Sequence, residues 1–180
     1  MGRAGSSTTH AILHRMLLAA SLVLLWVAAP EVVQGAQGSQ GSQGPQGAGD
    51  VAVIVHPGVP IDSLTLGELR RIVLGDRGFW PGSMRVSLML RAPVAHERDV
   101  ILRVVCQMTE AQFRQHWIAK VFRADAAIAP KIVYSSEMSV DMAAQIPGAI
   151  TFVDASKVGR NAKVLKIDGL LPGEKGYVLR

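Results

Sequence analysis

The chain has 180 residues, a formal net charge of +5 and 49% hydrophobic residues. Its basic residues are interspersed with acidic ones, as in Glu97-Arg98-Asp99, so they form no continuous stripe for a phosphate backbone, and the composition argues against nucleic acid as a partner. The single cysteine, Cys106, excludes an intramolecular disulfide and lies in an apolar run, where a buried, inert thiol is expected.

The first 35 residues have the pattern of a secretory signal peptide. An apolar run over 16–29 follows a basic segment that contains Arg3, His10, His14 and Arg15. Val33 and Gly35 are small residues of the kind that signal peptidase reads, which predicts cleavage before Ala36. The run is about 14 residues long, and a membrane-spanning helix needs about 20, so cleavage is favoured over the alternative of a retained anchor. The mature protein is therefore expected in the periplasm or outside the cell.

Residues 36–49 are predicted to be a flexible linker. Glycine recurs at every third position from Gly35 to Gly47 among Gln, Ser and Ala, but the tract is too short, and too poor in proline, for a collagen-like triple helix. Residues 50–180 then form the folded domain, and roughly 130 residues are enough for one hydrophobic core.

The domain is predicted to begin with a strand over 51–55, because this continuous apolar, β-branched run is typical of a strand buried on both faces. Thr65 and Glu68 form a capping-box pattern that predicts the start of a helix, and Gly75 closes it.

A second strand is expected over 85–91, where Val86, Leu88 and Leu90 alternate with Arg85, Ser87 and Met89 on the other face. The remaining expected elements, in order, are helices over 95–108 and 109–122, a strand over 132–134, a helix over 136–145, and strands over 149–153 and 164–167. Strands that alternate with helices predict an α/β domain with a mixed or mostly parallel sheet. The predicted core contains Val53, Val55, Leu69, Ile72, Leu88, Leu90, Ile101, Val105, Trp117, Phe122, Ile150 and Phe152.

The sequence contains no familiar catalytic or metal-binding motif. It has no nucleophile elbow, zinc-protease motif, P-loop or dinucleotide fingerprint. The three histidines after the cleavage point, His56, His96 and His116, are not at metal-ligand spacing. We therefore expect no catalytic residues, no cofactor and no metal, and the protein is not expected to be an enzyme.

Five segments, in register, resemble the phosphate-binding component of bacterial ABC-type phosphate importers. They are Leu66 to Gly75, Trp80 with Arg85 to Arg91, Phe113 to Phe122, Pro147 to Val153, and Tyr177 to Arg180. The resemblance implies a periplasmic-binding-protein-like single lobe, similar to the second lobe of those two-lobed proteins. It also implies a small oxyanion ligand such as phosphate, with an ABC importer membrane complex or another envelope protein as partner.

The ligand arginine of that family corresponds to Arg91. The Ser-Gly-Thr that follows it in the family is replaced here by Ala95-His96-Glu97, which removes two hydroxyls and adds a carboxylate.

We predict that an anion binds where the strand over 85–91 meets the next helix, because a helix amino terminus offers unpaired N–H groups. The candidate ligand-binding residues are Arg91, Ala95, His96, Arg98, Ser135 and Ser136. In the alternative interpretation, Arg91 and Arg98 pair with Glu97 or Asp99, and Ser136 only caps a helix. The function is then either solute binding linked to ABC-type import, or a non-transport adaptor in the cell envelope whose ligand site has decayed.

Overall fold

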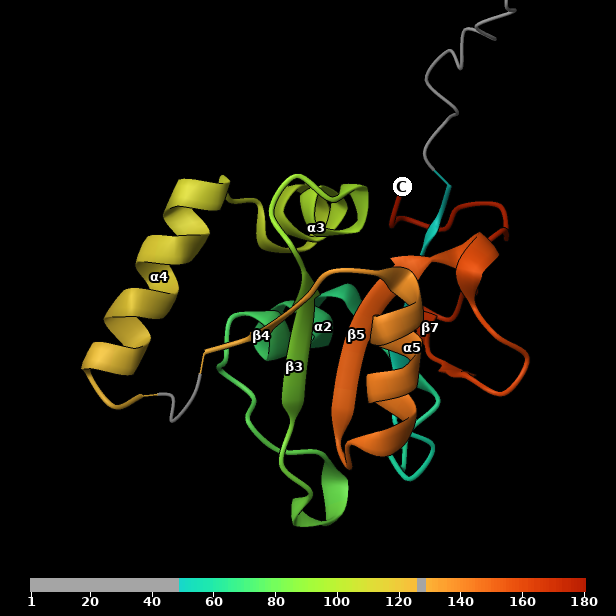
Figure 1. Cartoon of the computed structure of the whole chain (residues 1–180), viewed down its shortest axis with the longest axis horizontal. Coiled ribbons are helices and arrows are strands. Elements are labelled where there is room, and N and C mark those ends of the chain that lie inside the picture. The colour runs from blue at the N-terminus through green and yellow to red at the C-terminus, as the bar shows by residue number, and fades with distance from the viewer. Residues whose placement is uncertain (1–48, 126–128) are drawn as a thin grey trace, which may run out of the picture. The chain divides into compact units, whose positions relative to one another are not determined.

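The computed structural model describes residues 49–125 and 129–180 (Figure 1). The predicted signal peptide and nearly all of the predicted linker lie outside these residues. Within the described part of the chain, no helix has the length and apolar character needed to cross a membrane.

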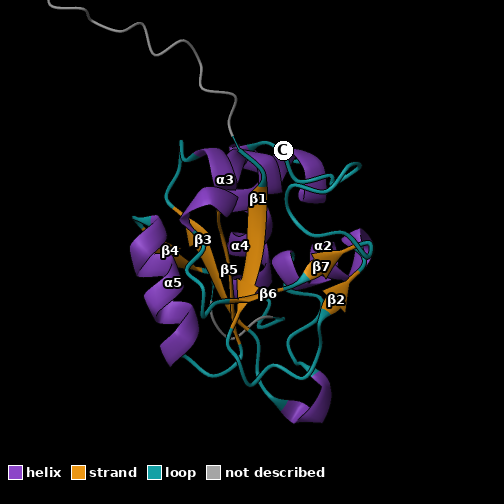
Figure 2. Ribbon diagram, turned by 90° about the vertical axis from the view of Figure 1, so that its right-hand side faces the viewer, coloured by secondary structure: helices purple, strands orange, loops and turns teal. Residues whose placement is uncertain are grey.

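The main sheet has five strands in the order β4-β3-β5-β1-β6 (Figure 2). Their bounds are β1 Val51–Val55, β3 Ser87–Arg91, β4 Lys131–Val133, β5 Ala149–Asp154 and β6 Lys163–Val164. β3 is parallel to both β4 and β5, whereas β1 is antiparallel to both β5 and β6. All strands except β1 therefore run in one direction, which confirms the prediction of a mixed, mostly parallel sheet.

A second sheet pairs β2, Ser63–Leu64, with β7, Lys166–Ile167, in parallel. The prediction of one strand over 164–167 was wrong, because the chain changes sheets within it. The N–H of Leu165 donates to Val53 of the main sheet, whereas the N–H of Lys166 donates to Asp62, next to β2.

Helices cover both faces of the main sheet (Figures 1 and 2). The bounds are α2 Leu66–Val73, α3 His96–Val100, α4 Glu110–Phe122 and α5 Ser136–Gln145, with short 3-10 turns at Pro81–Ser83 and Ala155–Lys157. The predicted capping box of Thr65 and Glu68 is present, and Thr109 with Gln112 forms another at the start of α4. α5 packs on one face, and α2, α3 and α4 pack on the other.

The predicted core residues, Phe122 apart, lie in one buried cluster between the sheet and α2, α3 and α4. Met89 agrees with the predicted alternation of β3: it lies on the opposite face from Leu88 and Leu90, where it is fully buried under α5. Phe122 was wrongly assigned to the core and is 91% exposed. The inward side of α4 is set by Phe113 and Trp117, and at 100° per residue Phe122 lies well off that stripe.

The helix predicted over 95–108 is two elements. α3 ends at Val100 and continues as a π-helix over Ile101–Cys106, which stops where Gln107 adopts the left-handed conformation. The spacing of apolar residues did not predict this change from α-helix to π-helix, because the buried positions of a short π-helix also fit an α-helix.

Candidate functional site

The predicted site lies at the carboxyl ends of the parallel strands. β3 ends at Arg91 and leads into α3, while β4 ends at Val133 and leads into α5. Because the two strands are parallel, both connections emerge at the same edge, and Figure 1 shows α3 and the first turn of α5 at that edge.

Arg91 and Glu97 meet at this edge. Nε of Arg91 lies 3.4 Å from Oε1 of Glu97, and the two side chains are only 14% and 8% exposed. In the described part of the chain, Nε and Nη1 of Arg91 are buried and have no acceptor in hydrogen-bonding geometry. The guanidinium is therefore held near one carboxylate while part of its donor capacity is unused.

The first turn of α5 supplies the hydroxyl groups. Ser136 Oγ donates to Oε1 of Glu97 at 3.3 Å, so Glu97 contacts both Ser136 and Arg91. Ser135 is the N-cap and accepts a hydrogen bond from the N–H of Met138 at 3.0 Å. The capping residue is thus Ser135 rather than Ser136.

Glu137 brings a second carboxylate near this edge. Its pKa is lowered because it accepts hydrogen bonds from its own backbone N–H and from the Ser135 hydroxyl, with a smaller contribution from the charge of Arg91. The sequence reasoning did not identify this residue. A glutamate in the first turn of a helix also stabilises that helix, so its position alone does not indicate a site.

The structure does not bring Arg98 into the site. Its Nε and Nη2 donate to the two carboxylate oxygens of Glu110 at 2.7 and 2.9 Å, and its Nη1 donates to the carbonyl of Arg91 at 3.0 Å. Its guanidinium also lies over the ring of Phe113, 5.5 Å from the centroid. Arg98 therefore ties the end of β3 to α4, and its partner is Glu110 rather than Glu97 or Asp99.

Ala95 and His96 contribute little polar chemistry to the edge. Ala95 is the N-cap of α3 and makes no side-chain capping bond. Nε2 of His96 lies 3.3 Å from the carbonyl of Gly49, so the imidazole is turned toward the start of the domain. The groups that converge are thus Arg91, Glu97 and Ser136.

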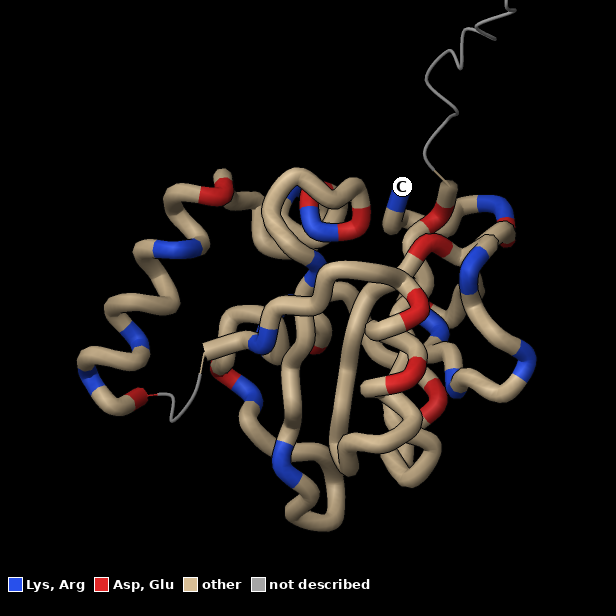
Figure 3. Tube along the Cα trace, in the orientation of Figure 1, with Lys and Arg blue, Asp and Glu red and all other residues tan. Residues whose placement is uncertain are grey.

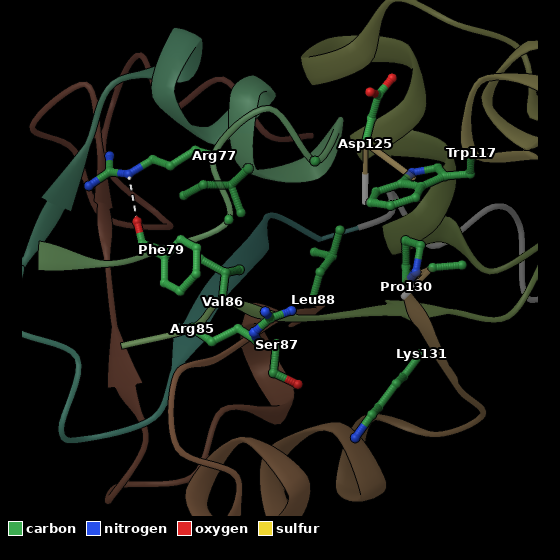
Figure 4. Close-up of a pocket in the computed structure, with 14 residues that line it drawn as sticks. Arg77, Phe79, Arg85, Val86, Ser87, Leu88, Trp117, Asp125, Pro130 and Lys131 are labelled. Atoms are coloured by element: carbon green, nitrogen blue, oxygen red, sulfur yellow. Dashed lines mark hydrogen bonds between the residues drawn. The ribbon is translucent and has the colours of Figure 1, made fainter. Parts of the chain in front are cut away.

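A separate hollow of about 320 Å³ lies at the opposite end of β3, lined by Val86, Leu88 and Trp117 (Figure 4). Arg77 borders it, but its guanidinium is engaged with the carbonyl of Phe79 and with Glu68. None of the predicted ligand-binding residues lines this hollow.

The described residues contain no cluster of three or more potential metal ligands. Cys106 is buried, and burial raises the pKa of its thiol to about 12, so the reactive thiolate is scarce at neutral pH.

Solved structures of phosphate receptors share this fold. A putative phosphate ABC transporter substrate-binding protein from Clostridium perfringens, solved with bound phosphate, is 18% identical with a TM-score of 0.56, over 69% of this chain and 47% of that one. An ABC-type phosphate transport receptor from Vibrio cholerae is 15% identical with a TM-score of 0.55, over 69% and 48%. PstS from Borrelia burgdorferi is 13% identical with a TM-score of 0.58, over 73% and 54%.

This chain therefore matches about half the length of each of these structures. No protein-family model matches the sequence, and no curated protein matches it either. The fold confirms the resemblance inferred from the five segments: the described residues form a periplasmic-binding-protein-like α/β lobe that resembles part of the phosphate receptors of ABC transporters.

Proposed function

We propose that this chain is an exported solute-binding-type protein, and that its domain holds a small oxyanion, such as phosphate, at the edge formed by Arg91, Ser135 and Ser136. The C. perfringens structure of the same fold was solved with bound phosphate, which supports this choice of ligand.

The observation that carries the proposal is the incomplete pairing of Arg91. Its side chain is 14% exposed, yet Nε and Nη1 have no hydrogen-bond acceptor among the described residues. A buried guanidinium whose donors are not all hydrogen-bonded is costly, and an oxyanion is an acceptor suited to such donors. Ser136 lies close enough to share Glu97 with Arg91, so its hydroxyl is placed to donate to the same anion.

Glu97 sets the strength of this binding. Its carboxylate already contacts Arg91 and Ser136, so an incoming anion must displace it or accept repulsion from it. We therefore expect weak binding by the domain alone, and tighter binding when a partner surface encloses the ligand.

The proposed location and partner rest on the amino-terminal pattern and on the neighbours. The charge and apolar pattern of residues 1–35 predicts export, and the neighbours are named as receptors of phosphate ABC transport. An ABC importer membrane complex is thus the proposed partner, with another envelope protein as the alternative.

Intact-mass measurement of the envelope-associated protein is expected to place the mature amino terminus near Ala36. Retention of residues 1–30 would contradict cleavage and favour a signal anchor.

Calorimetry of the full chain tests the ligand proposal. Phosphate, sulfate and acetate are titrated into the wild type, into Arg91→Gln, and into Arg123→Gln as a control whose arginine is 59% exposed and pairs with Asp125. We expect saturable phosphate binding that Arg91→Gln removes and Arg123→Gln preserves. Binding that Arg91→Gln leaves unchanged would place the site elsewhere.

A second candidate function is a non-transport adaptor with a decayed ligand site. The adaptor is favoured by the position of Glu97, whose carboxylate contacts Arg91 and Ser136 where a bound anion would lie. Absence of binding by any of the three anions at millimolar concentration, in the wild type and in Glu97→Gln alike, would support the adaptor and contradict the oxyanion proposal.

A further inference from the structure

Among residues 49–125 and 129–180, β4 is an edge strand of the main sheet, with β3 as its single neighbour. The N–H of Ala92 donates to the carbonyl of Val133 at 2.9 Å, so the backbone groups of Val133 face β3. Because backbone groups alternate along a strand, those of Ile132 face away from β3. A free edge of this kind is a template for pairing with another strand.

α4 projects beyond this edge of the sheet, as Figure 1 shows. It is anchored through Phe113 and Trp117, which are 2% and 7% exposed, whereas Ile118, Val121 and Phe122 are 55%, 43% and 91% exposed. Between α4 and β4 lies an open groove of about 710 Å³ with an apolar lining that includes Leu90, Ile118, Val121, Phe122, Pro130 and Ile132. Clustered exposed apolar residues of this kind mark an interaction site.

The register of β4 determines which side chains face the groove. Ile132 lies opposite Leu90, and both line the groove, whereas Lys131 lies opposite Met89, which faces α5. Figure 4 accordingly shows the Lys131 side chain directed away from Trp117. A strand of a partner that pairs with β4 would alternate in the same way. Every second side chain of that strand would enter the groove, and the others would lie on the same face of the sheet as Lys131.

The charges beside the groove that have no partner among the described residues are basic. Figure 3 shows basic positions along α4. Arg98 and Glu110 neutralise one another, but among the described residues Arg114, at the groove, and Lys131 have no carboxylate partner. Complementary charge on a bound strand is therefore negative.

From the free edge, the apolar groove and the unpaired basic residues, we infer that β4 and α4 together bind an extended segment of a partner protein in which apolar and acidic residues alternate. The apolar side chains fill the groove under α4, the acidic ones face Lys131, and the backbone pairs with Ile132. This surface is distinct from the edge around Arg91 and does not depend on the proposed anion binding.

Two other occupants fit less well. Residues 36–48 of this chain contain only Gly, Gln, Ser, Ala and Pro, so they have no large apolar side chain for the groove. A second copy paired through β4 would bring its own Lys131 beside that of the first, and like charges on neighbouring strands destabilise pairing.

The probe is a labelled synthetic peptide in which isoleucine and glutamate alternate, titrated into the full chain and followed by fluorescence anisotropy. We expect saturable binding, about tenfold weaker binding of a matched isoleucine–lysine peptide, and a reversal of this preference in Lys131→Glu. Equal binding of the acidic and basic peptides by the wild type would overturn the inference.

Backbone pairing is tested with two further peptides, one N-methylated at every isoleucine and the other at every glutamate. Amides of neighbouring residues point to opposite sides of a strand, so only one of the two peptides is expected to lose binding. Loss with both peptides, or with neither, would contradict pairing along the edge.

The groove is tested with Val121→Asp, which we expect to weaken peptide binding about tenfold or more. Val178→Asp is the matched control, because Val178 is 38% exposed, compared with 43% for Val121, and does not line the groove. An equal effect of both substitutions would overturn the assignment. Sedimentation of the unliganded chain is expected to show a monomer, and a dimer that Val121→Asp dissociates would identify a second copy as the occupant instead.

Discussion

Arg91 and Glu97 form a largely buried ion pair at the carboxyl end of β3, with 3.4 Å between Nε and Oε1. Ser136 donates to the same carboxylate oxygen. The chain thus supplies its own carboxylate at the place where the sequence analysis predicts an anion.

The first prediction concerns this competition. Glu97→Gln removes the negative charge but keeps a side chain of similar size, so we expect phosphate affinity to rise by about tenfold or more. Calorimetry measures the change in affinity. Glu174→Gln is the control, because Glu174 is an exposed carboxylate that accepts a hydrogen bond from the backbone N–H of Leu171. Unchanged affinity in Glu97→Gln would show that this carboxylate does not compete with the ligand.

The second prediction is that Arg91→Ala destabilises the fold by about 3 kcal/mol, because it leaves the Glu97 carboxylate buried without its cation. Urea unfolding measures the free energy. Adding Glu97→Gln to Arg91→Ala should recover much of the loss, since it removes the unpaired charge. If the double variant is no more stable than Arg91→Ala, the ion pair is not the cause.

The third prediction concerns Gly148, which has a φ of +72°. A Cβ at this position would clash with the carbonyl oxygen of Arg85, and the Gly148 carbonyl also accepts a hydrogen bond from the indole N–H of Trp80. Gly148→Ala is expected to destabilise the protein by about 3 kcal/mol, through backbone strain and overpacking. Gly67→Ala is the control, because a Cβ at Gly67 has no neighbour within 4 Å, and alanine stabilises a helix by up to about 1 kcal/mol relative to glycine. Equal melting temperatures for the two variants would contradict this account.

The fourth prediction is that Cys106 resists alkylation in the folded protein. Burial raises its pKa to about 12, so the thiolate that reacts with iodoacetamide is scarce at pH 8. Mass spectrometry is expected to find modification only after urea is added. Rapid labelling without urea would indicate that the π-helix over Ile101–Cys106 opens readily.

The fifth prediction concerns acid stability. The pKa of Asp154 is lowered, chiefly because its carboxylate accepts a hydrogen bond from the Ser156 side chain and a second from the Ser156 backbone, whose nitrogen lies 2.8 Å from Oδ1. A lowered folded-state pKa stabilises the protein above the usual value of 3.8, and this stabilisation is lost as pH falls through the lower folded-state pKa. Asp154→Asn should therefore reduce the stability more at pH 5 than at pH 2. Melting temperatures across this range measure the difference, and a constant difference would exclude the linkage.

Local patterns in the sequence predicted much of the fold. The apolar run over 51–55, the capping box at Thr65 and the spacing of buried residues around Leu69 and Ile72 are set by neighbouring residues, and the structure confirms them. The predicted sheet type and the resemblance to phosphate receptors also agree with the structure. These features need only strand alternation, helical periodicity and capping, which short segments encode.

Only the tertiary structure decided which side chains meet at the candidate site. Arg98 is adjacent to Glu97 in sequence, yet it pairs with Glu110, because the turn after the π-helix brings the start of α4 back to α3, which carries Arg98. Phe122 is exposed because α4 projects past the sheet. β4 is an open edge because the strand order of the described residues leaves it without a second neighbour. The sequence by itself determined the local elements, since their causes lie within a few residues. The partners of Arg91 and Arg98 and the exposure of α4 were decided by packing between distant segments, which no local pattern specifies.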